Sequence, residues 1–555
     1  MNHFRLGFWQ TLLVLVTVVN AQLLSDSHSR PYNPVGQSVQ TSSGLVRGHA
    51  ASEPTVSEYL GIPYAVSPTG IGRFAPPVPY NGTGTILANG YPPGLRILSN
   101  LCRDCPANIA SLPAYPGLTR QGATIFKTFA QQLGTPQSED CLYLNVWTKP
   151  TQKLKPVLVF IHGGRFSVGG AHSPMYTGEH LAAKNDVVVV TFNYRLNIFG
   201  FSGAPGLPQN VGLLDQRMAI EWVHSNIAAF GGDPGRITIF GQSAGGASVD
   251  YYSYIWTDKP LVRGLISHSG TALSFRPNTA EESASYFYYV AGTLGCGNST
   301  DPVDQVVACL RQQPVAAVLS AVKKVPFAPS PALPQPQFHP TVDGVTVFDN
   351  YAERSAQGKF IKTPYLITSN NNEAGYYRIN AFAGGIDLTD EAWNRFNQAA
   401  FTCPSSRAAA DRAAHGVSTW QARYFGDFWN LRLYPTSGAY HGTDLHMVFG
   451  TAEEITGIPD SEVERKTNAY ISSAWVEFAK DPERGLEKLG WPKYKPTGEG
   501  LVAFVVDEGM LTRIGKTLVG LGYKNESKAR ILDQKVYDAG CAALNGDTTP
   551  GKGAF

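Results

Sequence analysis

The residues with the clearest chemical potential are Gly241-Gln242-Ser243-Ala244-Gly245, a Gly-x-Ser-x-Gly pentapeptide. An apolar run at residues 237–240, which predicts a buried strand, leads directly into it, and small residues that suit the start of a helix follow. In this context the pentapeptide predicts a strained turn that lifts the serine hydroxyl above a sheet, at the positive end of a helix. Ser243 is therefore predicted to be a nucleophile.

Ser243 needs a general base and a carboxylate, because an unassisted serine hydroxyl is a poor nucleophile at neutral pH. Where such a turn carries a catalytic serine, the acid follows it in the chain and the histidine follows the acid. The histidines after Ser243 that could act as the base are His268, His339, His415, His441 and His446. Spacing alone does not select among them, because the three groups assemble in space.

A sheet must hold these groups in place. Near-continuous apolar runs predict strands that are covered on both faces, at residues 156–161, 187–192, 237–240, 265–267 and 365–368. Between them, residues 214–230 place apolar side chains at helical spacing. Strands that alternate with helices predict an α/β fold with a large, mostly parallel central sheet flanked by helices.

The composition indicates a chain with a large core. The 555 residues are 43% hydrophobic and 11% aromatic, which excludes a mostly disordered chain. At about 150 residues per domain, this length predicts three or four domains, or one very large one. Six prolines between residues 325 and 340 favour a loop across one domain over a linker, because core-like sequence follows them. The 45 basic and 43 acidic residues give a formal net charge of +2, so there is no basic surplus to bind nucleic acid.

The first 21 residues predict a secretory signal peptide. A short basic start precedes an apolar run at residues 12–19, and Val19 and Ala21 fit a small-residue cleavage site before Gln22. The alternative is an uncleaved membrane anchor, but the run is too short to span a bilayer. No other stretch resembles a transmembrane helix, so we expect no membrane span and a secreted mature chain that begins at Gln22.

Seven cysteines agree with an oxidising compartment, where they favour disulfides and one leftover thiol. Three Asn-x-Ser/Thr triplets, at Asn81, Asn298 and Asn525, are candidate glycosylation sites. No group of cysteines and histidines has metal-ligand spacing, and no glycine-rich loop fits a phosphate. Neither a metal nor a cofactor is therefore expected.

Several further stretches resemble the type-B carboxylesterase family, which includes cholinesterases and some fungal lipases. They are Tyr-Leu-Gly-Ile-Pro-Tyr-Ala at 59–65, Arg-Phe-Ala-Pro-Pro at 73–77, Glu-Asp-Cys-Leu-Tyr-Leu-Asn-Val-Trp at 139–147, His-Gly-Gly at 162–164, Asn-Tyr-Arg-Leu at 193–196, Gly-Leu-Leu-Asp-Gln at 212–216 and Phe-Gly-Gly-Asp-Pro at 230–234. The resemblance covers most of the mature chain. It implies a single α/β-hydrolase domain over residues 22–555 that hydrolyses carboxylic esters.

The resemblance also implies the partners of Ser243. The acid is the glutamate of an Asn-Glu-x-Gly stretch, Glu373, and the base is the histidine of a Gly-x-x-His-Gly stretch, His441. His446 is the main competitor for the base. His162 is expected to position the neighbouring glycine loop rather than to transfer a proton.

An oxyanion hole is implied in the same way. The family takes its donors from the backbone N–H groups of a glycine-rich loop and of the residue after the nucleophile, which here are Gly164, Arg165 and Ala244. The third loop position is often glycine in the family, so Arg165 is a departure, although its N–H remains. A second departure is that Glu373 and His441 are only 68 residues apart, fewer than in cholinesterases. This predicts a more open or differently capped site.

The resemblance implies two disulfides, Cys105–Cys141 and Cys296–Cys309. Three cysteines remain. A pair between Cys403 and Cys541 would leave Cys102 as the free thiol.

The implied substrate is a small-molecule ester. Cholinesterases hold a quaternary ammonium over a tryptophan in the first disulfide loop, but residues 105–141 contain no tryptophan, and Gln242 replaces the acidic residue those enzymes carry before the serine. The sequence also lacks the large hydrophobic flap of interfacial lipases. Short- to medium-chain or aromatic esters are therefore favoured over choline esters and long-chain triglycerides.

Two other functions compete with ester hydrolysis. An acyltransferase would use the same acyl-enzyme and resolve it with an alcohol instead of water. A non-catalytic, cholinesterase-like binding protein would have lost triad residues, whereas all three candidates are present here.

Overall fold

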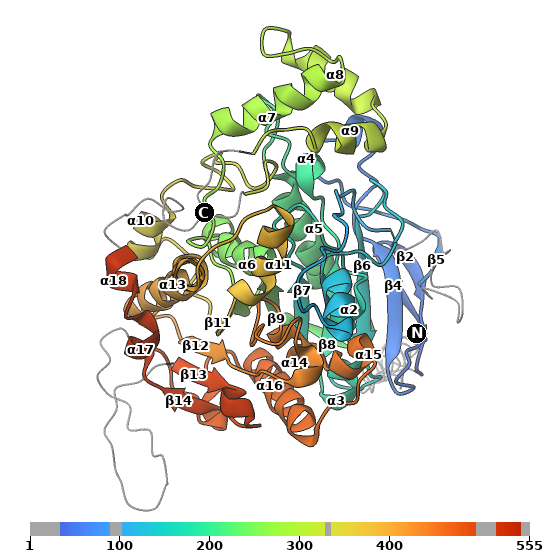
Figure 1. Cartoon of the computed structure of the whole chain (residues 1–555). Coiled ribbons are helices and arrows are strands. Elements are labelled where there is room, and N and C mark those ends of the chain that lie inside the picture. The colour runs from blue at the N-terminus through green and yellow to red at the C-terminus, as the bar shows by residue number, and fades with distance from the viewer. Residues whose placement is uncertain (1–33, 89–102, 328–334, 496–517, 545–555) are drawn as a thin grey trace, which may run out of the picture.

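The structure is a computed structural model, and it describes residues 34–88, 103–327, 335–495 and 518–544 (Figure 1). The predicted signal peptide and Cys102 lie outside the described residues.

A mixed sheet forms the centre of the molecule (Figure 1). Within the described residues it has eleven strands, in the spatial order β14 (Arg530–Leu532), β13 (Leu518–Leu521), β12 (Thr419–Tyr424), β11 (Tyr365–Asn370), β10 (Gly264–His268), β9 (Gly232–Gln242), β7 (Lys155–Ile161), β8 (Val188–Phe192), β6 (Tyr143–Thr148), β4 (Ser57–Pro63) and β3 (His49–Ala50). The strands from β13 to β8 pair in parallel, and the strands beyond them pair antiparallel. The predicted mostly parallel α/β sheet is confirmed.

A smaller sheet lies at the N-terminal side of the described chain. It consists of β1 (Ser38–Thr41), β2 (Gly44–Arg47) and β5 (Thr85–Leu87).

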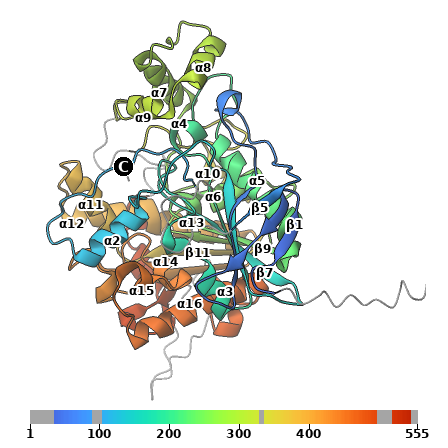
Figure 2. The same ribbon diagram turned by 90° about the vertical axis from the view of Figure 1, so that its right-hand side faces the viewer.

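Helices connect the strands and cover both faces of the large sheet (Figures 1 and 2). They are α2 (Arg120–Phe129), α3 (Glu179–Lys184), α4 (Asn197–Gly200), α5 (Val211–Asn226), α6 (Ala244–Ile255), α7 (Ala280–Thr293), α8 (Val303–Gln312), α9 (Val315–Val322), α10 (Tyr351–Ala356), α11 (Ala374–Ala383), α12 (Asp390–Asn397), α13 (Cys403–Ala414), α14 (Asp444–Phe449), α15 (Ala452–Thr456), α16 (Glu462–Lys480), α17 (Gln534–Asp538) and α18 (Cys541–Leu544).

The strand β7 shows why a continuous apolar run predicts a central strand. All seven of its residues are buried. Successive side chains of a strand point to opposite faces: Val157 and Val159 pack into a core with helices α5, α6 and α13, whereas Leu158 and Phe160 pack into a second core with α3, α14 and α16. Each strand of this kind therefore joins two hydrophobic cores. The runs predicted as strands coincide with β7, β8, β9, β10 and β11.

Helices α7, α8 and α9 form a lobe at one end of the sheet, at the top of Figures 1 and 2. Their apolar side chains build a separate core cluster, which Phe74 and Phe199 join from the main body. The disulfide between Cys296 and Cys309 ties the end of α7 to α8.

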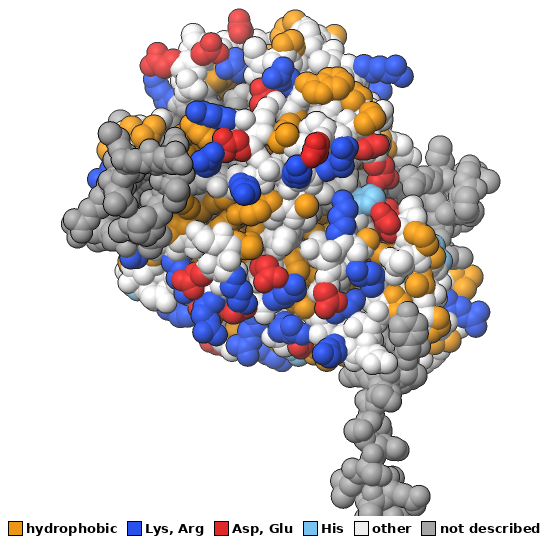
Figure 3. Space-filling view, turned by 90° about the horizontal axis from the view of Figure 1, so that it is seen from below, with side chains coloured by type: hydrophobic (Ala, Val, Ile, Leu, Met, Phe, Trp, Pro, Cys, Tyr) orange, Lys and Arg blue, Asp and Glu red, His pale blue; other side chains and the backbone are white. Residues whose placement is uncertain are grey.

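The molecular surface carries mixed charge. On the face seen in Figure 3, basic and acidic side chains are interspersed, in keeping with the near-neutral composition. None of the helices in the described ranges has the length and apolar character that a membrane crossing requires.

Candidate active site

Ser243 lies in the sharp turn between β9 and α6. Its φ of +60° is a left-handed backbone conformation that costs energy for a residue with a side chain. The turn is held by a 2.8 Å hydrogen bond from the Ser243 N–H to the His268 carbonyl. The motif needs glycine because a Cβ on Gly245 would lie 2.0 Å from the carbonyl oxygen of Ile161. The strand, the turn and the helix are as the pentapeptide predicts.

The structure brings His441 and Glu373 together. His441 Nδ1 lies 2.6 Å from Glu373 Oε2, and both side chains are 1% exposed. The other carboxylate oxygen of Glu373 accepts hydrogen bonds from the Ser269 hydroxyl at 2.7 Å and the Asn370 N–H at 2.6 Å. These contacts fix the carboxylate, which in turn fixes the orientation of the imidazole ring.

The other ring nitrogen of His441 faces away from Glu373. The Tyr377 hydroxyl lies 3.3 Å from His441 Nε2. Tyr377 and Phe401 also place their rings 5.0 Å from the imidazole, centre to centre. An imidazole that donates through Nδ1–H to Glu373 leaves Nε2 as an acceptor, which is the state a general base needs.

The other candidate histidines have different partners. His268 Nδ1 lies 2.7 Å from Asp444, and the Trp475 indole N–H donates to His268 Nε2 at 3.0 Å, so both ring nitrogens are occupied. Burial raises the pKa of the Asp444 carboxyl, but its hydrogen bonds to His268 and Asn370 and its attraction to the nearby histidines together outweigh burial and leave the pKa below its usual value. This buried histidine–aspartate pair does not line the cavity of Ser243.

His446 is buried within α14, and its two ring nitrogens make no hydrogen bond to the described residues. Burial lowers its pKa to about 4. His339 binds the backbone carbonyl groups of Pro336 and Arg276, and His415 binds that of Ala356. Of the candidate bases, all of which the structure describes, only His441 shares a cavity with Ser243.

The glycine loop after β7 has an unusual backbone. Gly164, Arg165 and Phe166 have φ values of +109°, +57° and +59°. A Cβ on Gly164 would lie 2.1 Å from the Val168 carbonyl oxygen, so this position needs glycine. Gly164 and Arg165 line the same cavity as Ser243 and His441.

His162 contacts this loop and stabilises its position. It is buried, its Nδ1 lies 2.9 Å from the Gly163 carbonyl oxygen, and its ring stacks on Tyr194 with centres 4.5 Å apart. Burial lowers the pKa of His162 to about 4, which keeps the ring neutral near pH 7. These contacts suit the positioning role predicted for His162.

The cavity beside Ser243 has a volume of about 740 Å³. Aromatic side chains form much of its wall: Phe126, Phe129, Phe327, Phe338, Tyr376 and Tyr377. Sequence reasoning missed these walls. Tyr376 and Tyr377 carry one usable signal, because helical spacing places residues three and four positions after Glu373 near it.

The described residues form three disulfides: Cys105–Cys141, Cys296–Cys309 and Cys403–Cys541. The first closes a loop of 36 residues that contains α2. Phe126 and Phe129 at the end of α2 reach from this loop into the cavity. The disulfide therefore anchors one wall of the site.

The side chains of the three candidate glycosylation asparagines are on the surface. Asn81, Asn298 and Asn525 are all exposed. The Asn525 amide nitrogen, which a glycan would modify, donates to the Asp427 carbonyl at 3.2 Å. A glycan at Asn525 would replace one of the two hydrogens on this nitrogen and leave a single N–H for the bond.

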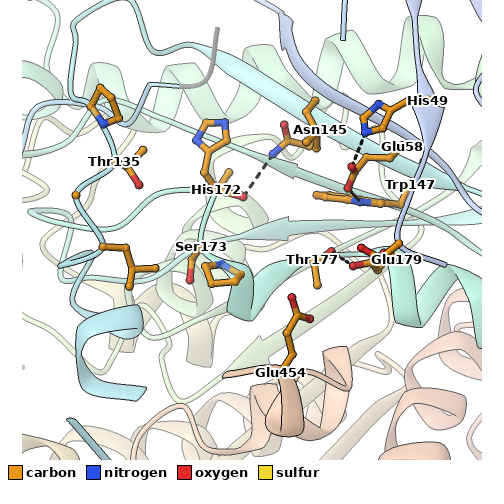
Figure 4. A pocket seen from close by; sticks show the side chains of 17 residues that line it. His49, Glu58, Thr135, Asn145, Trp147, His172, Ser173, Thr177, Glu179 and Glu454 are labelled. Carbon is orange, nitrogen blue, oxygen red and sulfur yellow. Dashed lines mark hydrogen bonds and ion pairs between the residues drawn. The ribbon is translucent and has the colours of Figure 1, made fainter. Parts of the chain in front are cut away.

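A second cavity, of about 280 Å³, lies beside β4, β6 and α3 and shares no lining residue with the cavity of Ser243 (Figure 4). Glu58, Glu179 and Glu454 line it, and Glu58 binds both His49 at 2.8 Å and the Trp147 indole N–H at 2.6 Å. Burial raises the pKa of the Glu179 carboxyl. This cavity is acidic, whereas the larger cavity holds the serine and histidine.

His180 groups with two of these acids. Potential ligand atoms of Glu179, His180 and Glu454 lie within 4.8 Å of one another, although the sequence showed no metal-ligand spacing. His180 lies 3.3 Å from Glu454 and 3.6 Å from Glu53, and its hydrogen bond to Glu454 raises its pKa. These carboxylates thus favour the protonated form of the His180 imidazole.

Replacing Cys141 with serine is expected to lower both stability and esterase activity. Loss of a disulfide that closes 36 residues lowers the free energy of unfolding by about 3 to 4 kcal/mol in the loop-entropy model. It also removes the covalent constraint on the loop that contains α2, which forms one wall of the cavity. The measurements are the free energy of unfolding in urea and kcat/KM on a p-nitrophenyl ester.

Cys102→Ser is the control and should change neither value much, because Cys102 is predicted to be the spare thiol. Peptide mapping under non-reducing conditions checks the pairing directly. A Cys102–Cys141 peptide would contradict it.

The fold and the site define a class of protein. A mostly parallel sheet with a serine in the strand-to-helix turn, and a buried histidine–glutamate pair at the same cavity, is the arrangement of an α/β-hydrolase. The sequence profile of the carboxylesterase family matches residues 35–387, and the chain belongs to that family. The resemblance seen in the sequence is thereby confirmed.

Named relatives cover nearly the whole chain. It is 34% identical to "Secreted lipase 5" of Gibberella zeae over 84% of this chain and 90% of the relative. It is 31% identical to a chlorogenic acid esterase of Aspergillus niger over 91% and 98%, and 36% identical to a liver carboxylesterase of Sus scrofa over 92% and 95%. The chain is therefore a carboxylic-ester hydrolase whose substrates are small-molecule esters. The disulfides and the relative named as secreted fit an extracellular protein.

Proposed function

We propose that this chain hydrolyses carboxylic esters through an acyl-enzyme on Ser243, with His441 as general base and Glu373 orienting it. The observation that carries the proposal is the 2.6 Å contact between His441 Nδ1 and Glu373 Oε2, beside the cavity that Ser243 and His441 share. Neither the serine nor the imidazole acts well alone, so their convergence supports this reaction.

In the first half-reaction the Ser243 hydroxyl oxygen attacks the ester carbonyl carbon. Its proton moves to His441 Nε2, and the Glu373 carboxylate stabilises the imidazolium that forms. His441 then returns the proton to the leaving alkoxide, which departs as an alcohol. In the second half-reaction a water molecule attacks the acyl-enzyme with the same base, and the acid product is released.

Backbone N–H groups of Gly164, Arg165 and Ala244 are proposed to bind the oxyanion of each tetrahedral intermediate. Ala244 is the first residue of α6, so its N–H has no acceptor within the helix. The positive φ values of Gly164 and Arg165 support a turn that directs consecutive N–H groups to one point.

The proposed mature protein is secreted and consists of one catalytic domain over residues 22–555. Its disulfides suit an oxidising compartment, and the exposed Asn81 and Asn298 suit glycosylation. Short- to medium-chain and aromatic esters are the proposed substrates, because the cavity is walled by aromatic rings. One relative is named a lipase and another a chlorogenic acid esterase, so fatty-acyl esters and aromatic esters are the first to test.

A series of p-nitrophenyl esters of increasing acyl length tests the proposal on purified mature protein. We expect a burst of p-nitrophenol equal to the number of active sites, followed by turnover that peaks at short to medium chains. A phosphonate inhibitor should label Ser243 in the same preparation. Folded protein that shows neither burst nor label would favour a binding protein. An ester product formed only when an acceptor alcohol is added, with no free acid in its absence, would favour the acyltransferase.

A further inference from the structure

Helix α11 reaches both ring nitrogens of His441. Glu373, the N-cap residue of this helix, contacts Nδ1 at 2.6 Å, and the Tyr377 hydroxyl, one turn further along, lies 3.3 Å from Nε2. Residues four positions apart lie on the same face of a helix, which explains how one helix supplies both contacts. The contact at Nδ1 belongs to the triad, whereas the contact at Nε2 has no role in the reaction proposed above.

The Tyr377 hydroxyl also forms a hydrogen bond with the Ser243 side chain. Burial raises the pKa of the Tyr377 phenol, and the nearby Arg165 guanidinium and this hydrogen bond oppose only part of the rise. The phenol therefore keeps its proton at neutral pH and can donate a hydrogen bond. It lines the catalytic cavity together with Ser243 and His441, so a bound ester has access to it.

Aromatic neighbours fix the ring of Tyr377. The residue is 4% exposed, and the ring centres of Phe396 and Phe401 lie 5.0 and 5.9 Å from its own. The four residues from Ala374 to Tyr377 are the start of α11, whose first turn packs into the same apolar cluster. A side chain held in this way presents its hydroxyl at one point, so it needs little reorganisation when charge develops nearby.

The leaving oxygen of an ester must come close to this hydroxyl. His441 Nε2 takes the proton of Ser243 and then gives it to the leaving oxygen, so both oxygens come within hydrogen-bond distance of Nε2. In the free enzyme the Tyr377 hydroxyl contacts both Nε2 and the Ser243 side chain. It therefore lies where the leaving oxygen can accept its hydrogen bond.

We propose that the Tyr377 hydroxyl is a further catalytic group of this site, which donates a hydrogen bond to the leaving oxygen of the ester. As the tetrahedral intermediate collapses, the bond between its carbon and the leaving oxygen breaks, and the electron pair stays on that oxygen. The His441 proton moves to the same oxygen, while the phenol keeps its own proton. The hydrogen bond stabilises the charge that develops before the proton has arrived. This inference rests on the proposed function and adds a residue to the same reaction.

Three esters with one acyl group and different leaving alcohols test the inference on the full mature protein. They are p-nitrophenyl, phenyl and benzyl butyrate, in order of decreasing acidity of the alcohol. All three form the same acyl-enzyme, so their kcat/KM values differ only through binding and acylation. The readout is the ratio of kcat/KM for p-nitrophenyl butyrate to that for benzyl butyrate, in wild type and in Tyr377→Phe. Phenylalanine keeps the ring and lacks only the hydroxyl, and a ratio within one variant cancels general damage to the site.

Tyr377→Phe should raise this ratio by about 10- to 100-fold, the range for a hydrogen bond to a charged group. The p-nitrophenoxide ion leaves readily without a hydrogen bond, whereas the benzyl alkoxide is a poor leaving group, and phenyl butyrate should fall between them. The matched control is Tyr376→Phe, which removes a hydroxyl from the neighbouring residue in the same cavity lining. It should change the ratio by less than about threefold, because the Tyr376 hydroxyl bonds to Asn380 and not to the triad.

Three outcomes would overturn the inference: an unchanged ratio in Tyr377→Phe, a ratio that falls, or an equal rise in Tyr376→Phe. An equal loss of kcat/KM on all three esters is the first of these and would mean that Tyr377 only positions His441. In each case phosphonate labelling and turnover of p-nitrophenyl butyrate by the wild type would leave the proposed acyl-enzyme intact. Loss of labelling and of all ester turnover in the wild type would instead refute the proposed function itself.

Discussion

Replacing Ser243 with alanine is expected to abolish ester hydrolysis, with kcat reduced by at least about 10⁴-fold. The acyl-enzyme needs a nucleophilic oxygen at this turn. Alanine removes that oxygen and, like serine, has a Cβ, so the left-handed φ is no harder to adopt than in the wild type. The measurement is turnover of a p-nitrophenyl ester, together with covalent labelling by a phosphonate. Both should disappear while the melting temperature stays near that of the wild type.

Ser111→Ala is the matched control, because Ser111 lines the same cavity and loses the same hydroxyl. It should retain label and turnover within about threefold. Label that persists in Ser243→Ala and disappears in Ser111→Ala would contradict the assignment of the nucleophile.

The central strands and the serine turn were predictable because local sequence dictates them. A strand buried on both faces must be apolar throughout, and the turn tolerates only small neighbours, as the 2.0 Å approach at Gly245 shows. The strand β12 has no such signal. It is buried along its whole length but contains Gln421 and Arg423, whose polar groups bind Ser406 and Thr402 in neighbouring parts of the fold. Partners of this kind cannot be read from the strand itself.

The family stretches outside the site hold the scaffold together. Arg73 pairs with Glu139 at 2.6 Å, and Arg195 pairs with Asp215 at 2.7 Å, all four side chains being buried. Removal of one partner from such a pair leaves an uncompensated buried charge, at a cost of about 3 to 5 kcal/mol. All four residues lie in stretches that carry the resemblance to the family.

Apart from Tyr376 and Tyr377, whose helical spacing from Glu373 is a usable signal, the walls of the cavity were beyond the reach of sequence reasoning. Phe126 and Phe129 come from the helix inside the first disulfide loop, Tyr377 from the helix after Glu373, and Phe338 from the proline-rich region. Each is one of many aromatic residues in the chain, and only tertiary packing brings them around one serine. The second, acidic cavity is likewise formed by residues that are distant in the sequence.

Replacing His441 with alanine is expected to reduce kcat by at least about 10³-fold, because the base that accepts the Ser243 proton is lost. Only a neutral imidazole can accept a proton, so any pH dependence that the base imposes on turnover should be absent from the variant. The measurement is kcat/KM from pH 4 to pH 9. For the wild type, the enzyme concentration is the number of active sites that a phosphonate titrates.

His446→Ala is the control, since His446 lies on the neighbouring helix and was the main competitor for the base. Burial lowers the pKa of His446 to about 4, and of His162 likewise, so both rings stay largely neutral as the pH falls from 7 to 5. Any loss of wild-type activity in that range is therefore expected to belong to neither of them. His446→Ala should lose stability through the cavity it leaves but keep the wild-type pH profile per folded site. If the pH dependence of kcat/KM were lost in His446→Ala and kept in His441→Ala, the base would be His446. Glu373, which contacts His441, would then have no role in orienting the base.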